Sequence, residues 1–343
     1  MAVPVSQVLK VAKYAIGNTL KGRKRYPLVL MLEPLFQCNL QCAGCGKIQF
    51  PAEILKRRVS KEEAWAALEE CGAPMVSIAG GEPLIHEEMP EMVRGFIERK
   101  AFVYMCTNAQ LLMRKIDLYK PSKYFSFSIH LDGLPEEHDK AVNKPGAHAI
   151  AVEGLKEAVK RGFRVTTNTT IFNNAEPEKV RAHFDDLMAM GVEGMMISPG
   201  FPYEKAPNQD IFLERKKTVE LFRKILCNPK PHWVFNHSPS FLAFLKGEQE
   251  YDCTPWGNPT YSIFGWQKPC YLINDGYVKT FDELLDCIDS YDLGVKGTRP
   301  ECKDCMLHSG HEPSAVCDIF GSFGGMMRAS KHMKNFKKQN QKA

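Results

Sequence analysis

Three cysteines at close spacing are the residues of this chain best suited to chemistry. Cys38, Cys42 and Cys45 form a C-x3-C-x2-C triplet directly after the apolar stretch 27–32. A [4Fe-4S] cluster that only transfers electrons usually has four cysteine ligands, so a cluster with three has one iron open to a small molecule. The structural alternatives are a zinc site or a buried group of thiols. Zinc usually takes a fourth Cys or His, and none lies within twenty residues on either side. The triplet therefore predicts a catalytic [4Fe-4S] cluster.

Polar groups recur where later apolar stretches end. The stretch 75–80 leads into Gly80, Gly81 and Glu82. Glycine lets the backbone approach a ligand closely, and a carboxylate accepts a hydrogen bond from an ammonium group. Alternate positions of a strand share one face, and in 124–133 and 164–172 such positions carry Ser126, Ser128, His130, Asp132, Thr166, Asn168 and Thr170. We expect Ser128 and Asn168 to bind a polar ligand; for each, a satisfied polar core residue is the alternative.

Cys106, at the end of the stretch 101–108, is a candidate hydrogen-atom donor because thiols give up a hydrogen atom readily. The alternative for Cys106 is a small buried hydrophobic residue, which free cysteine often is. His130 is a rival donor or a group that orients the substrate.

A second group of cysteines lies near the C-terminus. Cys253 and Cys270 are followed by the pair Cys302-x2-Cys305, and Cys317 comes later. The first four predict an auxiliary site, which would be one further iron–sulfur cluster, a zinc ion or a set of packed reduced thiols. Ser309 and the long gap to Cys317 argue against two further clusters.

The elements that must position these residues alternate between strands and helices. Six apolar stretches predict strands, and helical patterns such as 60–72, which begins with Ser60 and has Glu63 three residues later, lie between them. Six β/α units in order predict an α/β fold, with a parallel sheet curled into a partial, TIM-like (β/α)6 barrel and the active site at the carboxyl ends of the strands. The six stretches are 27–32, 75–80, 101–108, 124–133, 164–172 and 194–200.

Composition and charge set the wider frame. The 343 residues are 44% apolar, which is enough for a full core. Twelve cysteines without a signal peptide predict a reducing cytoplasm, and no stretch is apolar enough to span a bilayer. The net charge of +5 is concentrated at the two ends, which argues against a broad nucleic-acid surface. We expect a basic amphipathic helix at 1–26, a core barrel at 27–235, and an extension at 236–343 with cysteine-rich segments and a basic tail.

The N-terminal segment has apolar residues at helical spacing beside six Lys or Arg residues and no acid. This pattern predicts either a helix on an anionic membrane surface or a helix docked on the core with solvated charges. The apolar positions are Val5, Val8, Leu9, Ala12, Ile16 and Leu20.

The cysteine triplet after a strand, followed one strand later by the run GGEP, resembles the radical S-adenosylmethionine (SAM) superfamily. The resemblance implies that SAM chelates the open iron and that the reduced cluster cleaves it to a 5'-deoxyadenosyl radical. It also implies that Gly80, Gly81 and Glu82 hold the amino group of SAM, and that Ser128 and Asn168 are suited to its ribose and carboxylate. An electron donor such as a flavodoxin or ferredoxin would be required.

A closer resemblance, over nearly the full chain, is to the adenosyl-hopene transferases (adenosylhopane synthases) of bacterial hopanoid biosynthesis. It rests on the segments MAVPVSQVL, RKRYPLVLMLEPLFQCNLQCAGCGK, CTPWGNPTYSIFGWQKPCYL and CKDCMLHSGHEPSAV. It implies that the radical adds to the alkene of diploptene, that the resulting tertiary carbon radical is reduced, and that SAM is consumed. A triterpene is nearly insoluble in water, so peripheral contact with the inner face of the membrane would follow.

Two other functions stay open at this point. A radical SAM enzyme with an auxiliary cluster, of the SPASM type, would modify a peptide or another substrate. A non-catalytic iron–sulfur or zinc protein would bind metal without cleaving SAM.

Overall fold

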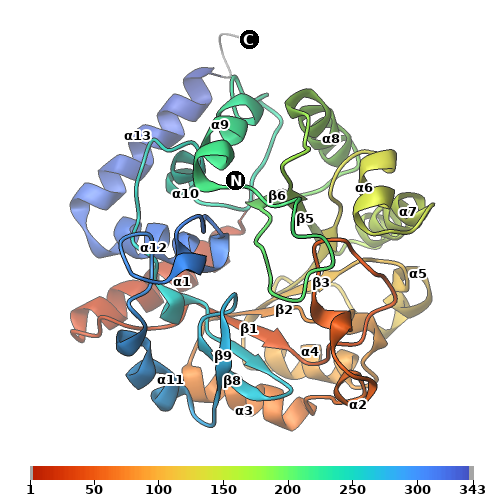
Figure 1. The fold of residues 1–343 in the computed structure, drawn as a ribbon, viewed down its shortest axis with the longest axis horizontal. Coiled ribbons are helices and arrows are strands. Elements are labelled where there is room, and N and C mark those ends of the chain that lie inside the picture. The colour runs from red at the N-terminus through yellow and green to blue at the C-terminus, as the bar shows by residue number, and fades with distance from the viewer. Residues whose placement is uncertain (1–2, 340–343) are drawn as a thin grey trace.

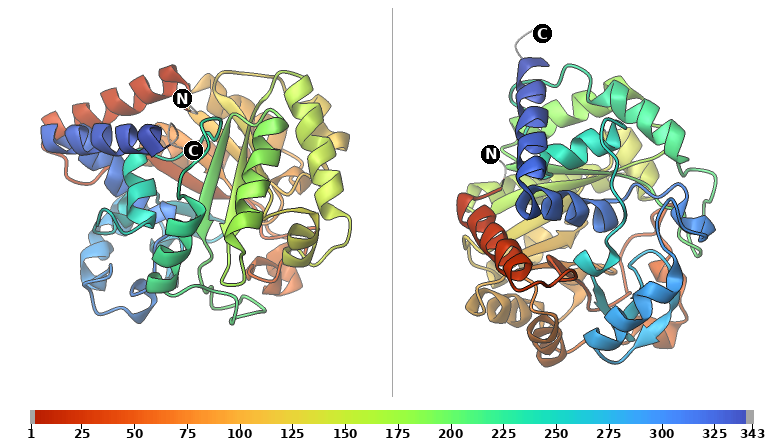
Figure 2. Two further views of the ribbon diagram at one scale, coloured as in Figure 1. Left: turned by 90° about the horizontal axis from the view of Figure 1, so that it is seen from above. Right: turned by 90° about the vertical axis from the view of Figure 1, so that its left-hand side faces the viewer.

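The computed structural model describes residues 3–339, which form one mixed sheet surrounded by helices (Figures 1 and 2). The first two residues of the expected N-terminal segment and the last four of the expected basic tail lie outside this range. The strands are β1 (Val29–Glu33), β2 (Met75–Ile78), β3 (Phe102–Thr107), β4 (Phe125–His130), β5 (Arg164–Ile171), β6 (Gly194–Pro199), β7 (Thr260–Ser262), β8 (Gly265–Pro269) and β9 (Asn274–Val278).

The first six strands lie in chain order and are parallel throughout. This confirms the six predicted strands and the parallel sheet, whereas closure into a partial barrel stays a prediction. On the other side of β1 the sheet continues with β7, which is parallel to β1. β8 then pairs antiparallel to β7, and β9 pairs antiparallel to β8. The cysteine-containing C-terminal part therefore extends the same sheet.

Helices lie on the outside of the sheet in Figure 1. Ser60 and Glu63 form the expected capping box at the start of α3, and Gly72 ends that helix in the left-handed conformation. The helices are α1 (Val5–Leu20), α2 (Ala52–Leu55), α3 (Lys61–Cys71), α4 (Met89–Glu98), α5 (Leu112–Lys115), α6 (Pro135–Ala141), α7 (Ala147–Lys160), α8 (Pro177–Ala189), α9 (Arg215–Ile225), α10 (Pro239–Leu245), α11 (Phe281–Ile288), α12 (His308–Gly321) and α13 (Phe323–Gln339).

The alternating sequence of β4 shows how the sheet divides its two faces. Phe125, Phe127 and Ile129 are buried in the main apolar core, and the rings of Phe125 and Phe127 pack 4.8 Å apart. The intervening residues Ser128 and His130 point to the other face, because successive side chains of a strand alternate, and both line a cavity there. The pleat therefore separates a packing face from a polar face.

The N-terminal helix docks on the core, but through a different stripe from the apolar one in the sequence. The buried residues of α1 are Gln7, Val11, Ala15 and Asn18, and the apolar ones pack beside Val316 and Phe320 of α12. Val5, Leu9, Ile16 and Leu20 remain 44–83% exposed. Spacing alone did not identify the docked face, because both stripes repeat at helical intervals.

No helix within residues 3–339 is both long enough and apolar enough to cross a bilayer.

Candidate functional site

The cysteine triplet lies on the loop that follows β1. The amide of Ala43 donates to the carbonyl oxygen of Ala141 (2.9 Å), which ties this loop to the end of α6. Cys38 and Cys42 pack against a small apolar cluster, and all three thiols are free and partly buried. The cluster consists of Leu40, Val142 and Ala147. The loop is therefore fixed by packing and by backbone hydrogen bonds, with its three thiols lining one cavity.

The glycines after β2 make close contact with the backbone that leads into the cysteine loop. The amide of Gly81 donates to Leu35 (2.8 Å), and the amide of Glu82 donates to Gln37 (2.9 Å). A Cβ added to Gly80 would lie 2.4 Å from the Leu35 carbonyl oxygen, and one added to Gly81 would lie 2.0 Å from that of Gln37. The sequence predicts that these glycines let a ligand approach, and both do line the cavity. Their closest neighbours, however, are backbone atoms of residues 35–37, so glycine is required here because this backbone passes so close.

Glu82 is almost fully buried and accepts three hydrogen bonds from the protein itself. Its Oε1 accepts from the Thr107 hydroxyl (2.7 Å) and the Leu84 amide (3.0 Å), and its Oε2 accepts from the Asn108 amide (2.8 Å). Burial raises the pKa of Glu82, and these hydrogen bonds oppose that shift. An ionised carboxylate has about four acceptor positions, so there is room for one further donor such as an ammonium group.

Thr107 and Asn108 were not singled out from the sequence, although they directly follow Cys106. Asn108 also donates from Nδ2 to Asn39 Oδ1 (2.8 Å) and approaches Cys38 Sγ (3.6 Å). It therefore links the end of β3 to the cysteine loop. Thr107 and Asn108 could have been identified as polar residues at the end of a predicted strand, which is the criterion that selected the candidates on β4 and β5.

Cys106 lies in the middle of the polar face of the sheet. It pairs in register with Ser128 of β4, and its Sγ lies 3.6 Å from the hydroxyl of Ser77 on β2. Burial raises the pKa of the Cys106 thiol, against the effect of hydrogen bonds with Ser77 and Ser128. At neutral pH this residue is therefore a protonated S–H group facing the cavity.

His130, whose side chain is 25% exposed, forms an ion pair with the more deeply buried Asp132 at the end of β4, with 2.8 Å between His130 Nε2 and Asp132 Oδ2. Asp132 also accepts a hydrogen bond from the amide of Thr170 (2.8 Å). Burial disfavours both charges, but their attraction outweighs it, so the pKa of His130 is raised and that of Asp132 is lowered. Asn168 lies beside His130 in register on β5.

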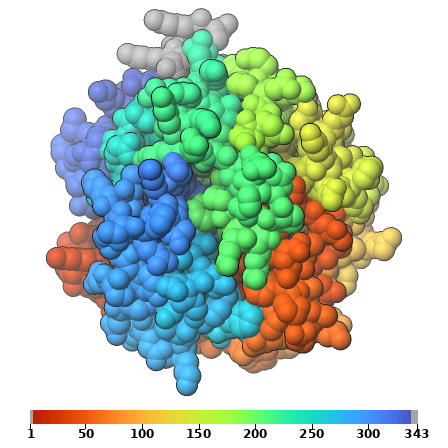
Figure 3. Space-filling view, viewed as in Figure 1, coloured from red at the N-terminus to blue at the C-terminus, as the bar shows by residue number. Residues whose placement is uncertain are grey.

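A single cavity of about 360 Å³ lies at the carboxyl ends of β1 to β6. It is lined by all the predicted site residues outside the C-terminal group, namely Cys38, Cys42, Cys45, Gly80, Gly81, Glu82, Cys106, Ser128, His130 and Asn168. The loop 200–214, green in Figure 3, lies near the centre of the face shown, between the orange and the blue segments. Of the aromatic and Met residues that a cavity wall could use, Met196, Phe201 and Tyr203 line it. Trp266, in contrast, is part of the main core.

Three further lining residues were given no role from the sequence: Lys47 beside the cysteine triplet, and Tyr271 and His308 from the C-terminal part. Lys47 forms a buried ion pair with Glu33 (2.7 Å), Tyr271 follows β8, and the Nδ1 of His308 lies 3.1 Å from the hydroxyl of Ser198. All but Glu33 line the cavity. The pairing of β7 with β1 helps to bring the C-terminal residues here.

The three free thiols of the triplet suit the [4Fe-4S] cluster that their spacing implies. Burial raises the pKa of Cys38 to about 11 and also raises those of Cys42 and Cys45, so a bound metal would be needed to hold them as thiolates. Within residues 3–339, no three Cys, His, Asp or Glu side chains are grouped for a single metal ion. The three thiols share the wall of a cavity of about 360 Å³, which has room for a multinuclear cluster beside them.

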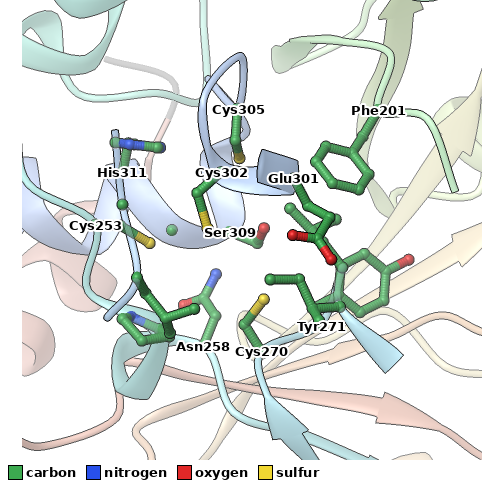
Figure 4. Close-up of a pocket in the computed structure, with 16 residues that line it drawn as sticks. Phe201, Cys253, Asn258, Cys270, Tyr271, Glu301, Cys302, Cys305, Ser309 and His311 are labelled. Carbon is green, nitrogen blue, oxygen red and sulfur yellow. The ribbon is translucent and has the colours of Figure 1, made fainter. Parts of the chain in front are cut away.

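Four of the six cysteines in the C-terminal part 236–343 also lie together. Cys253, Cys270, Cys302 and Cys305 line one smaller cavity (Figure 4). Cys317 does not join them: it lies on α12, where it packs near Tyr26.

Comparison with known proteins divides the chain into two matched regions. Residues 32–187 match the family described as the radical SAM superfamily, and residues 195–329 match a domain of unknown function, DUF3463. The first region contains the cysteine triplet and the strand ends up to β5. The second contains β6 and the C-terminal cysteines. Members of the radical SAM superfamily use a [4Fe-4S] cluster and SAM, which agrees with the cofactors expected here.

Curated relatives match mainly the first region. The Fe-coproporphyrin III synthase of Methanosarcina barkeri is 29% identical over 206 residues, covering 53% of this chain and 50% of that protein. The GTP 3',8-cyclase 1 of Mycobacterium tuberculosis is 26% identical over 162 residues, or 44% and 45%. The chain therefore spans about half the length of these relatives.

Solved structures share the fold at low identity. SuiB of Streptococcus suis bound to its precursor peptide SuiA has a TM-score of 0.65 at 16% identity, covering 90% of this chain and 77% of that one. The structure of anSMEcpe with bound AdoMet has a TM-score of 0.58 at 14% identity, covering 92% and 98%.

Proposed function

We propose, from the radical SAM domain at residues 32–187, that this chain is an adenosyl transferase that forms a carbon–carbon bond between the 5'-deoxyadenosyl group of SAM and the alkene of diploptene, giving adenosylhopane. The observation that carries the proposal beyond SAM chemistry is the composition of the cavity wall. Thiols and polar groups come from the ends of β1 to β5, and the later segments add a group of large apolar side chains beside further polar ones.

The apolar part of the wall suits a hydrocarbon substrate. It is supplied by the segment after the cysteine loop, by the segments after β5, β6 and β8, and by the turn before α12. Burying a hydrocarbon against such side chains is favourable by about 25 cal/mol per Å², and ligand cavities of about 300–1,000 Å³ are typical. The residues are Ile48, Phe50, Phe172, Met196, Phe201, Phe212, Leu272 and Leu307.

In this proposal, Cys38, Cys42 and Cys45 hold the [4Fe-4S] cluster, and Gly80, Gly81, Glu82, Ser128 and Asn168 bind SAM. The bound cluster and SAM supply the 5'-deoxyadenosyl radical, with electrons from a reductant such as a flavodoxin or ferredoxin. Glu82 has two tasks here: it fixes the turn through three hydrogen bonds, and its remaining acceptor position takes the ammonium group. His130, held by Asp132, orients the substrate.

Cys106 ends the reaction by donating a hydrogen atom. Its S–H bond breaks, a C–H bond forms at the tertiary carbon of the substrate radical, and the unpaired electron passes to the Cys106 sulfur. One electron and one proton, the electron from the same class of reductant, restore the thiol. The raised pKa of Cys106 supports this role, because a thiolate would have no hydrogen atom to give.

The test is anaerobic incubation of the reconstituted chain with SAM, a strong reductant and detergent-solubilised diploptene, followed by mass spectrometry. We expect a saturated adduct of adenosine and the triterpene. 5'-Deoxyadenosine without an adduct would retain the radical SAM assignment and reject the hopene assignment, and other alkenes and peptides would be tried next. A failure to cleave SAM would reject both.

We also propose that the chain works in the cytoplasm, in peripheral contact with the inner face of the cell membrane. Figure 2 shows α1 and α13 on one side of the molecule, and both contact α12. Leu9 and Leu20 of α1 are 64% and 83% exposed, and Phe323 of α13 is 77% exposed. Exposed basic residues lie on or next to the same helices, as on surfaces that bind anionic lipid. They are Lys13, Lys21, Arg23, Lys24, Lys331 and Lys334.

Replacing Leu9 and Leu20 together by Asp should weaken binding to anionic lipid vesicles. Burying one leucine contributes at least about 1.5 kcal/mol, so each loss should lower the partition coefficient about tenfold. Co-sedimentation with phosphatidylglycerol and with phosphatidylcholine vesicles measures it. Leu118→Asp is the matched control, because Leu118 is 51% exposed outside these helices. Equal binding by the double variant and the unmodified chain would contradict the proposed surface.

A further inference from the structure

The four cysteines of the smaller cavity come from three separate segments of the chain. Cys253 lies in the loop after α10, Cys270 directly follows β8, and Cys302 and Cys305 lie in the turn before α12. Figure 4 shows their side chains around one space, and all four line the same cavity. Their order along the sequence predicted a shared site, and the tertiary fold brings them to one cavity.

Each of these segments is held by specific contacts. The side-chain amide of Gln267 donates to the carbonyl oxygens of Cys270 (3.2 Å) and Tyr271 (3.1 Å). The amide of Thr254 donates to Gly310 of α12 (2.9 Å), and Arg215 donates to the carbonyl oxygen of Cys305 (3.2 Å). Hydrogen bonds to the backbone therefore hold the segments that carry these thiols in place around the cavity.

The four thiols have formed no disulfide. Four cysteines around one cavity match the ligand set of an iron–sulfur cluster. Tetrahedral zinc would use the same four ligands, so the identity of the bound metal is part of the test below.

Two buried polar atoms beside the thiols have no hydrogen-bond partner among the described residues. They are Nε2 of His311 and Oδ1 of Asn258, and both residues line the cavity. His311 is only 1% exposed. Nδ1 of His311 faces the carbonyl oxygen of Leu307 (3.2 Å) and so carries the ring proton, which leaves Nε2 with a free lone pair. Buried polar groups nearly always have a partner, so these two acceptor atoms call for a donor or a metal ion in this cavity.

Positive charge lies close to the same cavity. Arg299 and Arg215 act electrostatically on Cys270 and Cys305, respectively, and favour their thiolates. Four thiolates around a cluster carry net negative charge, which these guanidinium groups would offset.

The smaller cavity also adjoins the main one. Phe201, Tyr271, Leu272 and Ser309 line both. The rings of Tyr203 and Tyr271 pack edge to face, with 6.1 Å between their centroids, and Tyr203 also lines the main cavity. The two cavities therefore share part of their walls.

We infer that Cys253, Cys270, Cys302 and Cys305 bind a second iron–sulfur cluster, independent of the cluster at Cys38, Cys42 and Cys45. This inference concerns metal binding and does not depend on the identity of the alkene substrate.

The test uses the full chain in which Cys38, Cys42 and Cys45 are all replaced by Ala, reconstituted anaerobically with ferrous iron and sulfide. If both sites take a cluster of the same size, this variant should retain about half of the iron and acid-labile sulfide of the unmodified chain, in equal amounts, with the electron paramagnetic resonance signal of a reduced cluster. Adding Cys302→Ala and Cys305→Ala should remove the remainder. Adding Cys227→Ala and Cys287→Ala instead is the matched control, because these two cysteines lie outside both cavities.

A triple variant that is folded by circular dichroism but carries no iron and sulfide would overturn the inference, as would stoichiometric zinc in place of iron. If the Cys302/Cys305 variant is unfolded, Cys253→Ser keeps the test open, because serine nearly preserves the volume of the side chain. It should lose or alter the cluster signal; an unchanged signal would also overturn the inference. Since metal content is the readout, a failed hopene assay leaves this test unaffected.

Discussion

Gly81→Ala is expected to abolish assembly of the cluster at the cysteine triplet. The new Cβ would lie 2.0 Å from the Gln37 carbonyl oxygen, whereas ordinary contact begins at 3.4 Å, so one of the two segments must move by about 1.4 Å. The segment 35–37 cannot move freely, because it accepts hydrogen bonds from Gly81 and Glu82. Cys38 directly follows it, so the displacement reaches the first cluster ligand.

Overpacking of this kind costs about 1–3 kcal/mol of stability, and a misplacement near 1 Å can cost about 100-fold in rate. We therefore expect cleavage of SAM to 5'-deoxyadenosine to fall by about 100-fold or more, together with the iron bound at the triplet. Gly17→Ala is the control, because a Cβ there meets nothing within 4 Å. Wild-type iron content and SAM cleavage in Gly81→Ala would show that the turn does not position the cysteine loop.

Cys106→Ala should separate radical formation from the end of the reaction. Cys106 lies on the cavity wall between Ser77 and Ser128, apart from the loop that carries the triplet. SAM cleavage should therefore continue within a few-fold of the wild-type rate. The saturated adduct should fall sharply or form as a mixture of stereoisomers, because the substrate radical would take its hydrogen atom from elsewhere.

Cys106→Ser sharpens this test, since a serine hydroxyl keeps the shape and the polar contacts of the thiol but is a poor hydrogen-atom donor. Both variants should therefore give the same defect. Cys71→Ala is the control for loss of a buried thiol, because Cys71 is buried in the main core at the end of α3. Unchanged yield and unchanged stereochemistry in both Cys106 variants would exclude hydrogen donation by this residue.

The strands and the polar face of the sheet could be read from the sequence because they depend on local patterns. The alternation in β4 puts Phe125 and Phe127 on the packing face and Ser128 and His130 on the other, and a pleated strand permits no other division. In parallel strands laid in chain order, the carboxyl ends share one edge. The meeting of the triplet, Cys106 and Asn168 in one cavity follows from that geometry.

The roles of individual side chains were harder to predict from the sequence than the strands were. Glu82 could be placed near the cysteine loop, but its three internal hydrogen bonds depend on Thr107 and Asn108 from the next strand. The glycines of the same turn were explained by access for a ligand, whereas their closest neighbours are the carbonyl oxygens of Leu35 and Gln37. Such contacts join segments that are distant in sequence, so no local pattern reports them.

The sequence by itself determined the triplet, the six strands and the polar residues at their ends, because spacing and periodicity are properties of neighbouring residues. Only the tertiary structure decided which stripe of α1 docks, and it alone placed the predicted group of Cys253, Cys270, Cys302 and Cys305 in a cavity beside the main one. One physical reason is the pairing of β7 with β1. That contact spans more than two hundred residues and is selected by burial of the whole C-terminal part, which no short segment encodes.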